Sequence, residues 1–202
     1  MAELAFKTML IVNPVSGKGR VKGFLLDILA LLSANGAPVT VFLTEKHGDA
    51  TEFSQKYGAD FDRIICTGGD GSLNEVINGL MLLPESARPS IGYIPLGTTN
   101  DMASTLGIPK EPKNAIENLS AWTDSNQVKY IDIGCLGQLY FGYVAAFGAF
   151  TDIPFVTPQN AKNTWGYLAY VVVAIGSLSK ITTNHASIKF DGGYIEDDFM
   201  LG

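Results

Sequence analysis

The stretch "DRIICTGGDGSLNEVINGLMLL", residues 62–83, carries the signals of a strand, a loop and a helix in succession. Its opening "DRIICT" is a short apolar run without polar alternation, which is typical of a strand covered on both faces. Glycine and aspartate fill residues 68–71. From there Leu73, Val76 and Leu80 recur at helical spacing and predict a helix over 72–83. This order is the repeating unit of an α/β protein.

Segments on either side repeat the alternation of strands and helices. The pattern predicts strands beginning at Thr8 and at 38–44 and 90–96, and helices at about 21–32 and at 48–57. Asp49 and Glu52 have the spacing of a capping box at the start of the last of these helices. We therefore predict the α/β fold class, with a doubly wound, mostly parallel sheet.

Three polar or glycine-rich loops follow predicted strands: "NPVSGKG" at 13–19, "TGGDGS" at 67–72 and "PLGTTND" at 95–101. Ligands of open α/β sheets bind beyond the carboxyl ends of the strands. The three loops are therefore expected to open onto one edge of the sheet.

The pattern changes near residue 122, and we place a domain boundary between 123 and 124. Residues 127–150 predict strands that turn at Gly137 and Gln138, 167–178 predict an apolar helix, and 185–202 predict a hairpin that turns at 191–193. A few strands and one helix make a small core. We therefore expect 1–123 to form an α/β domain and 124–202 an incomplete β-rich domain.

Composition narrows the class of protein further. The 202 residues are 47% hydrophobic and 17% charged, as in a folded chain, and the net charge of −6 gives no support to a nucleic-acid partner. Cys66 and Cys135 each lie in an apolar run, which predicts buried free thiols. No signal peptide is visible, and the longest apolar run is shorter than the roughly 20 residues that cross a bilayer. These features predict a cytoplasmic protein.

The loop Gly68-Gly69-Asp70-Gly71 is the main candidate for a phosphate site. Glycines let backbone N–H groups approach a ligand, and the helix that follows adds unpaired N–H groups. The alternative is purely structural, because Gly-Asp-Gly is ordinary turn chemistry and Ser72 with Glu75 has the spacing of a capping box.

Asp70 favours phosphoryl transfer over simple phosphate binding. A carboxylate repels phosphates unless a divalent cation such as Mg²⁺ bridges the two, or unless it accepts a proton from a hydroxyl group. The loop at 95–101 adds Thr98, Asn100 and Asp101 as candidate nucleotide contacts, with Asp101 a second carboxylate, although Asn100 or Asp101 could simply cap a helix. The loop at 13–19 is not a Walker A motif, and by itself it is better explained as a strand-to-helix turn.

These motifs resemble the diacylglycerol kinase catalytic-domain family, which also holds sphingosine, ceramide and bacterial lipid kinases. The resemblance rests on "IVNPVSGKG", "TGGDGSLNEVINGL", "IGYIPLGTTNDMASTLGIP" and "VKYIDIG", in that order, and it extends over nearly the whole chain. It implies that 1–123 is a nucleotide-binding, ATP-binding α/β domain and that 124–202 is part of a β-rich lipid-substrate domain. It also implies Mg²⁺- and ATP-dependent phosphorylation of a lipid alcohol, with transient peripheral contact with a membrane.

The resemblance also implies roles for individual residues. The residues implied to bind the nucleotide and its phosphates are Asn13, Ser16, Gly17, Thr44, Gly68, Gly69, Asp70, Gly71, Ser72, Asn74, Glu75, Thr98 and Asn100. Asp70 would act through the metal or as the base, with Asp101 as the second catalytic candidate. Asp70, Asp101 and Asp132 would make up a water–magnesium network.

Two departures from the family pattern bear on activity. The family's second domain continues for about a hundred residues beyond "MLG", so we expect this chain to hold only part of it. The usual basic residue after "NDMA" is Ser104 here. Two alternatives therefore stay open, an NAD kinase relative and a nucleotide- or lipid-binding piece without turnover. The oligomeric state is not predicted.

Overall fold

The computed structural model describes residues 6–120, 128–149, 182–190 and 192–202. The chain divides into two compact units, Met1–Tyr143 and Val144–Gly202. Each unit is described by itself below.

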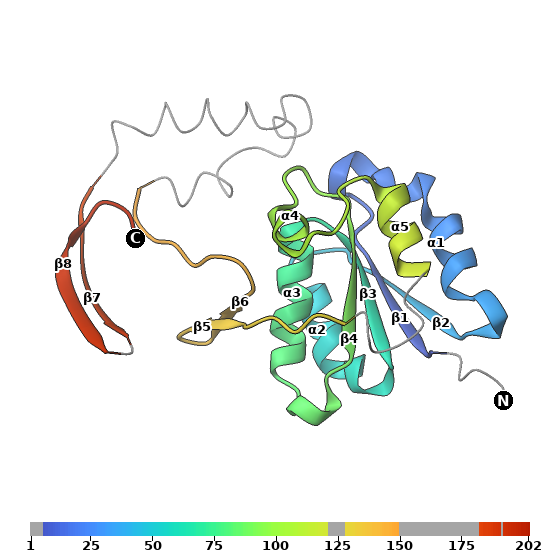
Figure 1. Ribbon diagram of the computed structural model, residues 1–202, viewed down its shortest axis with the longest axis horizontal. Coiled ribbons are helices and arrows are strands. Elements are labelled where there is room, and N and C mark those ends of the chain that lie inside the picture. The colour runs from blue at the N-terminus through green and yellow to red at the C-terminus, as the bar shows by residue number, and fades with distance from the viewer. Residues whose placement is uncertain (1–5, 121–127, 150–181, 191) are drawn as a thin grey trace. The chain divides into compact units, whose positions relative to one another are not determined.

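The first unit is built on a four-stranded parallel sheet with the order β2-β1-β3-β4. The strands are β1 (Thr8–Val12), β2 (Val39–Leu43), β3 (Arg63–Gly68) and β4 (Ser90–Pro95). In register, Val12 lies beside Leu43 on one neighbour and beside Thr67 on the other, and Thr67 lies beside Ile94. The carboxyl ends of the four strands therefore meet at one edge of the sheet (Figure 1).

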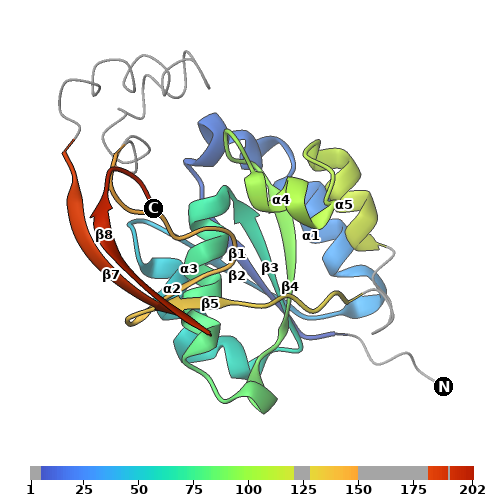
Figure 2. The ribbon, with the colours of Figure 1, turned by 60° about the vertical axis from the view of Figure 1, so that its left-hand side comes forward.

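Helices cover both faces of this sheet, as Figures 1 and 2 show. The helices are α1 (Leu25–Leu32), α2 (Asp49–Tyr57), α3 (Asp70–Met81), α4 (Asp101–Leu106) and α5 (Pro112–Ser120). Short 3₁₀ helices join them: η1 (Ser16–Gly23), η2 (Ala34–Gly36), η3 (Gly58–Asp60) and η4 (Glu85–Ala87). Helices α2 and α3 lie on one face, and α1 and α5 lie on the other (Figure 2).

The strand side chains alternate between two hydrophobic cores. Met9 and Ile11 of β1 pack in the core that α2 and α3 complete, with Val76 among its buried members. Leu10 and Val12 point the other way, into the core that includes Ile28 of α1. All five residues of β1 are buried, because a central parallel strand is covered on both faces. The predicted doubly wound α/β fold is therefore confirmed.

Strand β2 is less covered than the sequence suggested. It lies at the sheet edge, and the side chains of Val41 and Leu43 are exposed. An apolar run therefore marked the strand correctly but did not reveal its exposed positions, which depend on where the strand lies in the sheet.

The predicted capping box at Asp49 is wrong, and the alternative capping box at Ser72 does not form either. Helix α2 begins at Asp49, and the carboxylate of Asp49 accepts hydrogen bonds from the preceding backbone N–H groups of Lys46 and Glu45, at 2.9 and 2.7 Å. These bonds lower the pKa of Asp49. Helix α3 begins at Asp70 and not at residue 72, so Ser72 lies inside its first turn.

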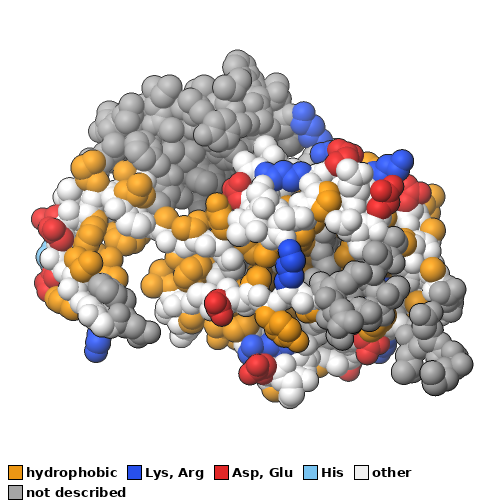
Figure 3. All heavy atoms as spheres, viewed as in Figure 1, with side chains coloured by type: hydrophobic (Ala, Val, Ile, Leu, Met, Phe, Trp, Pro, Cys, Tyr) orange, Lys and Arg blue, Asp and Glu red, His pale blue; other side chains and the backbone are white. Residues whose placement is uncertain are grey.

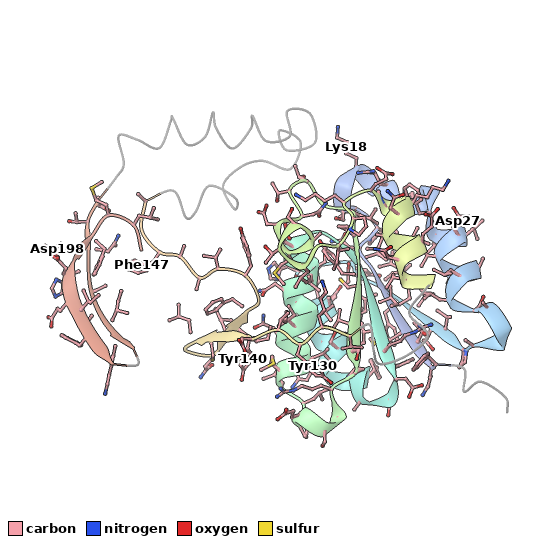
Figure 4. All side chains as sticks on the ribbon, viewed as in Figure 1. Lys18, Asp27, Tyr130, Tyr140, Phe147 and Asp198 are labelled. Atoms are coloured by element: carbon pink, nitrogen blue, oxygen red, sulfur yellow. The ribbon has the colours of Figure 1, made fainter. Side chains whose placement is uncertain are left out.

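A small hairpin continues the first unit beyond the sequence-based boundary at 123 and 124. It consists of β5 (Gly134–Leu136) and β6 (Leu139–Phe141), and Gly137 takes a positive φ in the turn, as expected for a tight hairpin. The side-chain amide of Asn78 on α3 docks β6, donating to the Tyr140 carbonyl at 2.8 Å and accepting from the Tyr140 N–H at 3.0 Å. Figure 4 shows Tyr140 beside α3.

This hairpin also corrects two predictions. Cys135, predicted to be buried, is exposed, whereas Cys66 in the centre of β3 is buried as predicted. Within 128–149, regular strands are limited to β5 and β6, so most of the predicted strand over 127–150 does not form in the described part. Figure 3 shows hydrophobic side chains over the hairpin, where Leu136 and Leu139 are exposed.

The second unit contains a long hairpin of β7 (Asn184–Phe190) and β8 (Gly193–Phe199). It turns at the predicted place. The segment around Phe147 pairs with the end of the chain, where the N–H groups of Phe147 and Gly202 donate to each other's carbonyls. The predicted helix over 167–178 lies outside the described residues. Among the residues that are described, no helix is long and apolar enough to cross a membrane.

One exposed histidine bridges the strands of this hairpin. His185 on β7 bonds Asp198 at 3.0 Å and Glu196 at 3.2 Å, both on β8. The hydrogen bonds to Asp198 and then Glu196 raise the pKa of His185 above its ordinary value.

Candidate functional site

The loop after β1 is joined to the loop after β3 by Asn13. Its side-chain amide donates to the Ser72 hydroxyl at 3.1 Å, and its carbonyl oxygen accepts from the N–H groups of Val15 and Ser16, both at 3.2 Å. Its own N–H donates to Thr67 at the end of β3. Asn13 therefore shapes its own turn and binds the first turn of α3 at the same time.

Gly17 brings the same loop against the loop after β4. It has a φ of 54°, and an added Cβ atom would overlap the carbonyl oxygen of Leu96. Lys18 and Gly19 continue the left-handed conformation, with φ of 67° and 72°. Lys18 lies at the same end of the first unit as α4, and its side chain points away from the unit (Figure 4). A glycine is required at position 17 because both the conformation and the close approach exclude a side chain.

The loops after β3 and β4 meet backbone to backbone. The Leu96 N–H donates to the Gly68 carbonyl at 2.6 Å. A Cβ atom added to Gly97 would lie 2.5 Å from the Gly69 Cα atom, closer than real Cβ contacts allow. A Cβ atom added to Gly71, by contrast, would meet no atom within 4 Å. The glycines therefore differ in their surroundings: Gly69 and Gly97 pack against each other, whereas Gly71 faces open space.

Two buried polar residues stabilise the contact between the loops after β3 and β4, which we call the junction. Asn100, only 4% exposed, accepts from the Gly97 N–H at 2.9 Å and donates to the Gly97 carbonyl at 3.1 Å. The Tyr93 hydroxyl lies 3.3 Å from both the Gly68 carbonyl and the Asn100 side-chain oxygen. Burial, followed by the nearby charge of Asp70, raises the pKa of Tyr93, so its hydroxyl stays protonated and remains a donor.

Asp70 lies between the two glycine loops. Its carboxylate accepts a hydrogen bond from the Thr99 hydroxyl at 3.3 Å and another from the Met102 N–H at 3.0 Å. The second donor belongs to the first turn of α4, whose N–H groups have no partners within the helix. Two neutral hydrogen-bond donors therefore fix the position of this carboxylate.

The first turn of α3 and the start of α4 meet around this carboxylate. The N–H groups that begin α3 have no acceptor within the helix and favour an anion. Asp101, the first residue of α4, is partly exposed next to Met102, the donor to Asp70. The site therefore combines backbone donors, which suit phosphate, with two carboxylates, whose hard oxygens suit Mg²⁺.

Several predicted site residues lie apart from this junction. Glu75 accepts a hydrogen bond from the Ala50 N–H at 3.2 Å and lies 3.3 Å from the His47 ring, so it ties α3 to the start of α2 instead of capping a helix. Thr44, at the end of β2, is buried with its hydroxyl 3.5 Å from the Val12 carbonyl. Asn74 is exposed one turn along α3.

The remaining predicted residues are exposed. Thr98 lies on the surface of the loop after β4, and Asp132 is exposed in the segment before β5. Across the described ranges, no group of three or more His, Cys, Asp or Glu side chains could hold a metal ion. Asp70, Asp101 and Asp132 therefore do not form such a cluster here. A Mg²⁺ ion bound mainly by phosphates and water needs only one or two carboxylates.

Sequence reasoning missed four residues that define this junction: Tyr93, Gly97, Thr99 and Lys110. Tyr93 is the one with a visible signal, since it places a hydroxyl in an otherwise apolar strand. Thr99 could not be told from its neighbour Thr98 by sequence, yet only the Thr99 hydroxyl bonds Asp70. Lys110 donates to the Thr99 carbonyl at 2.6 Å from a segment outside every quoted motif loop.

Comparison with known proteins identifies the family. A family model described as the diacylglycerol kinase catalytic domain matches residues 7–135, which include all three loops of the site. The chain belongs to this family. The match supports the resemblance that the motifs indicated, and it covers the whole of the four-stranded sheet and its helices.

Individual relatives agree with this assignment. A diacylglycerol kinase of Staphylococcus carnosus is 33% identical over 196 residues, which make up 96% of this chain and 62% of that protein. A diacylglycerol kinase of Bacillus subtilis is 34% identical over 96% of this chain and 63% of its own length. A crystal structure of a diacylglycerol kinase from Bacillus anthracis matches with a TM-score of 0.75 and 31% identity, covering 97% of this chain and 63% of that one. The chain thus spans about three fifths of the length of these relatives.

Proposed function

We propose that this chain carries the nucleotide-binding part of an ATP-dependent lipid kinase. The γ-phosphate of ATP would pass to the hydroxyl group of a lipid alcohol such as diacylglycerol. The names of the relatives support the lipid acceptor, and the site supports the nucleotide. The observation that carries the proposal is the position of Asp70, a carboxylate held by Thr99 and Met102 where two glycine loops meet.

The nucleotide-binding role follows from the backbone of the three loops. Gly17, Gly69 and Gly97 let the three loops pack closely, and the unpaired N–H groups at the start of α3 are then available to phosphate oxygens. Asn13 and Asn100 hold the loops in this arrangement through the hydrogen bonds described above. Because the loops are already ordered, binding of the nucleotide costs little conformational entropy, which is the benefit of a preorganised site.

Asp70 and Asp101 are the proposed acidic residues of the reaction. They would hold a Mg²⁺ ion, which would supply positive charge between the carboxylates and the phosphates of the nucleotide. In this proposal the hydrogen bonds from the Thr99 hydroxyl and the Met102 N–H keep the Asp70 carboxylate in one position. Asp132 stays a candidate for the same network through water. A lipid acceptor would bring the protein into transient contact with a membrane surface.

The test is ATP turnover by the 202-residue chain in Mg²⁺ with diacylglycerol in mixed micelles, beside a titration of Mg²⁺-ATP binding. Phosphate transfer to the lipid would show that these residues hold a working site. Binding without transfer would favour the second candidate, a nucleotide-binding portion whose chemistry needs further residues, as the coverage of the relatives suggests. Absence of nucleotide binding would contradict both. NAD offered as the acceptor would separate a lipid kinase from an NAD kinase-like activity.

The carboxylate is tested by Asp70→Asn, with Asp27→Asn as its control. An asparagine at position 70 can still accept from Met102 and meet the Thr99 hydroxyl, so the fold is expected to persist. Loss of the charge should weaken Mg²⁺-dependent ATP binding about tenfold or more, since a charge–metal contact is removed. Asp27 is exposed on α1, away from the junction (Figure 4), and its variant should bind as the parent does. Equal binding by all three proteins would refute the role of Asp70.

A further inference from the structure

Lys110 reaches the site from outside the motif loops. Its ammonium group donates to the Thr99 carbonyl at 2.6 Å. The hydroxyl of the same threonine donates to Asp70. A positive charge is therefore attached to the residue that also positions the site's central carboxylate.

The chain offers a second lysine for comparison. Lys129 donates to the Leu106 carbonyl at 3.1 Å, in the last turn of α4. There a cation is favourable, because the carbonyl groups that end a helix attract positive charge. Lys110 instead bonds the loop that precedes α4. A capping role therefore explains Lys129 and does not explain Lys110.

Two properties leave the Lys110 ammonium group able to bind an anion. An ammonium group has three N–H donors, and the hydrogen bond to Thr99 uses one. The side chain is also exposed, so a ligand can approach it. Figure 3 shows Lys and Arg side chains at the end of the first unit where Figure 1 places α4.

We propose that Lys110 is a phosphate-binding residue of the nucleotide site, which contacts the terminal phosphates while it stays bonded to Thr99. The inference rests on the proposed function, because it assumes that the three loops bind a nucleotide. The polyphosphate of ATP lies in this proposal near the carboxylates of Asp70 and Asp101, and an added cation offsets the repulsion between these groups. Lys110 then distinguishes ligands by the number of phosphates that they carry.

The experiment is calorimetric titration of ATP, ADP and AMP into the parent chain and the variants Lys110→Gln, Lys110→Arg and Lys129→Gln. Lys110→Gln should weaken ATP binding about fivefold or more, which is the effect of losing an exposed, charge-assisted contact. The loss should be smaller for ADP and absent for AMP. Lys110→Arg should recover most of the ATP affinity, and Lys129→Gln should match the parent with all three nucleotides.

The graded loss separates this role from a structural one. If Lys110 only holds the loop, the variant should lose the same factor for ATP, ADP and AMP, and that result would overturn the inference. Unchanged ATP affinity in Lys110→Gln would also overturn it. Failure of the parent to bind any nucleotide would contradict the proposed function itself, so the two failures are distinguishable.

A second measurement needs no variant. Acetylation of lysines in the parent chain, followed by mass spectrometry, reports the access of reagent to each ammonium group. ATP should protect Lys110 more than AMP does and should leave Lys129 unprotected. Equal modification of Lys110 with and without ATP, in protein that binds ATP, would refute the contact.

Discussion

The close approach of the loops after β3 and β4 makes Gly97→Ala a sharp test of the site. The added Cβ atom would lie 2.5 Å from the Gly69 Cα atom and 2.7 Å from the Asn100 side-chain oxygen. Carbon atoms in ordinary contact are about 3.5–4.0 Å apart. The two loops must therefore separate by roughly 1 Å, or Asn100 must give up its bonds to the residue at 97.

The expected magnitude follows from these contacts. Overpacking of a tight site costs typically about 1–3 kcal/mol. Weakening one of the two bonds between Asn100 and residue 97 adds about 1 kcal/mol. The reduced backbone freedom of alanine in the unfolded chain restores about 0.4–1 kcal/mol. Because Gly97 has no positive φ, no further conformational strain is expected. We expect the free energy of unfolding to fall by about 2 kcal/mol.

The assay is urea unfolding followed by circular dichroism, with Gly23→Ala as the control. A Cβ atom at Gly23 would meet no atom within 4 Å, and its φ is not positive, so that variant should stay within about 0.5 kcal/mol of the parent. Gly97→Ala should also lose nucleotide affinity, whereas Gly23→Ala should keep it. Equal unfolding free energies for the two variants would refute the tight contact between the loops.

Three further predictions concern other parts of the chain. Hydrogen bonds to the two carboxylates on β8 raise the pKa of His185 above 6.5, so the stability that His185 gives the hairpin should be complete below pH 6.5 and should be lost as the pH rises through the folded-state pKa. An NMR titration that gives His185 a pKa of 6.5 or less would contradict this prediction. Native protein at pH 8 should react with a thiol reagent at Cys135 alone, because burial raises the pKa of the Cys66 thiol to about 12. Labelling of both thiols before unfolding would refute the burial of β3. Asn78→Ala should lower the free energy of unfolding by about 1–3 kcal/mol, because the β6 backbone loses its side-chain amide partner, whereas Asn74→Ala at an exposed site should change it little. Equal effects of the two substitutions would argue against the docking of β6 on α3.

The local patterns of the sequence were enough to predict the main layers of the first unit. Apolar runs marked the four parallel strands, and helical spacing marked α1, α2 and α3. Side-chain capping was predicted poorly. Asp49 and Ser72 stand at the right spacing for capping boxes, but the side chains of both form hydrogen bonds with neighbouring loops, and α3 begins two residues before Ser72. Short-range spacing cannot decide between a cap and a partner supplied by another part of the chain.

The sequence by itself determined the α/β class and placed the three loops at one edge, because strand and helix periodicities and glycine positions are local properties. It also identified Asp70 as the unusual charge among the glycines. Only the tertiary structure decided that Thr99 and Met102 hold Asp70, that Gly69 packs against Gly97, and that Lys110 reaches the same loop. These contacts join residues from separate segments, and their distances depend on how the strands and helices pack, which no local pattern encodes.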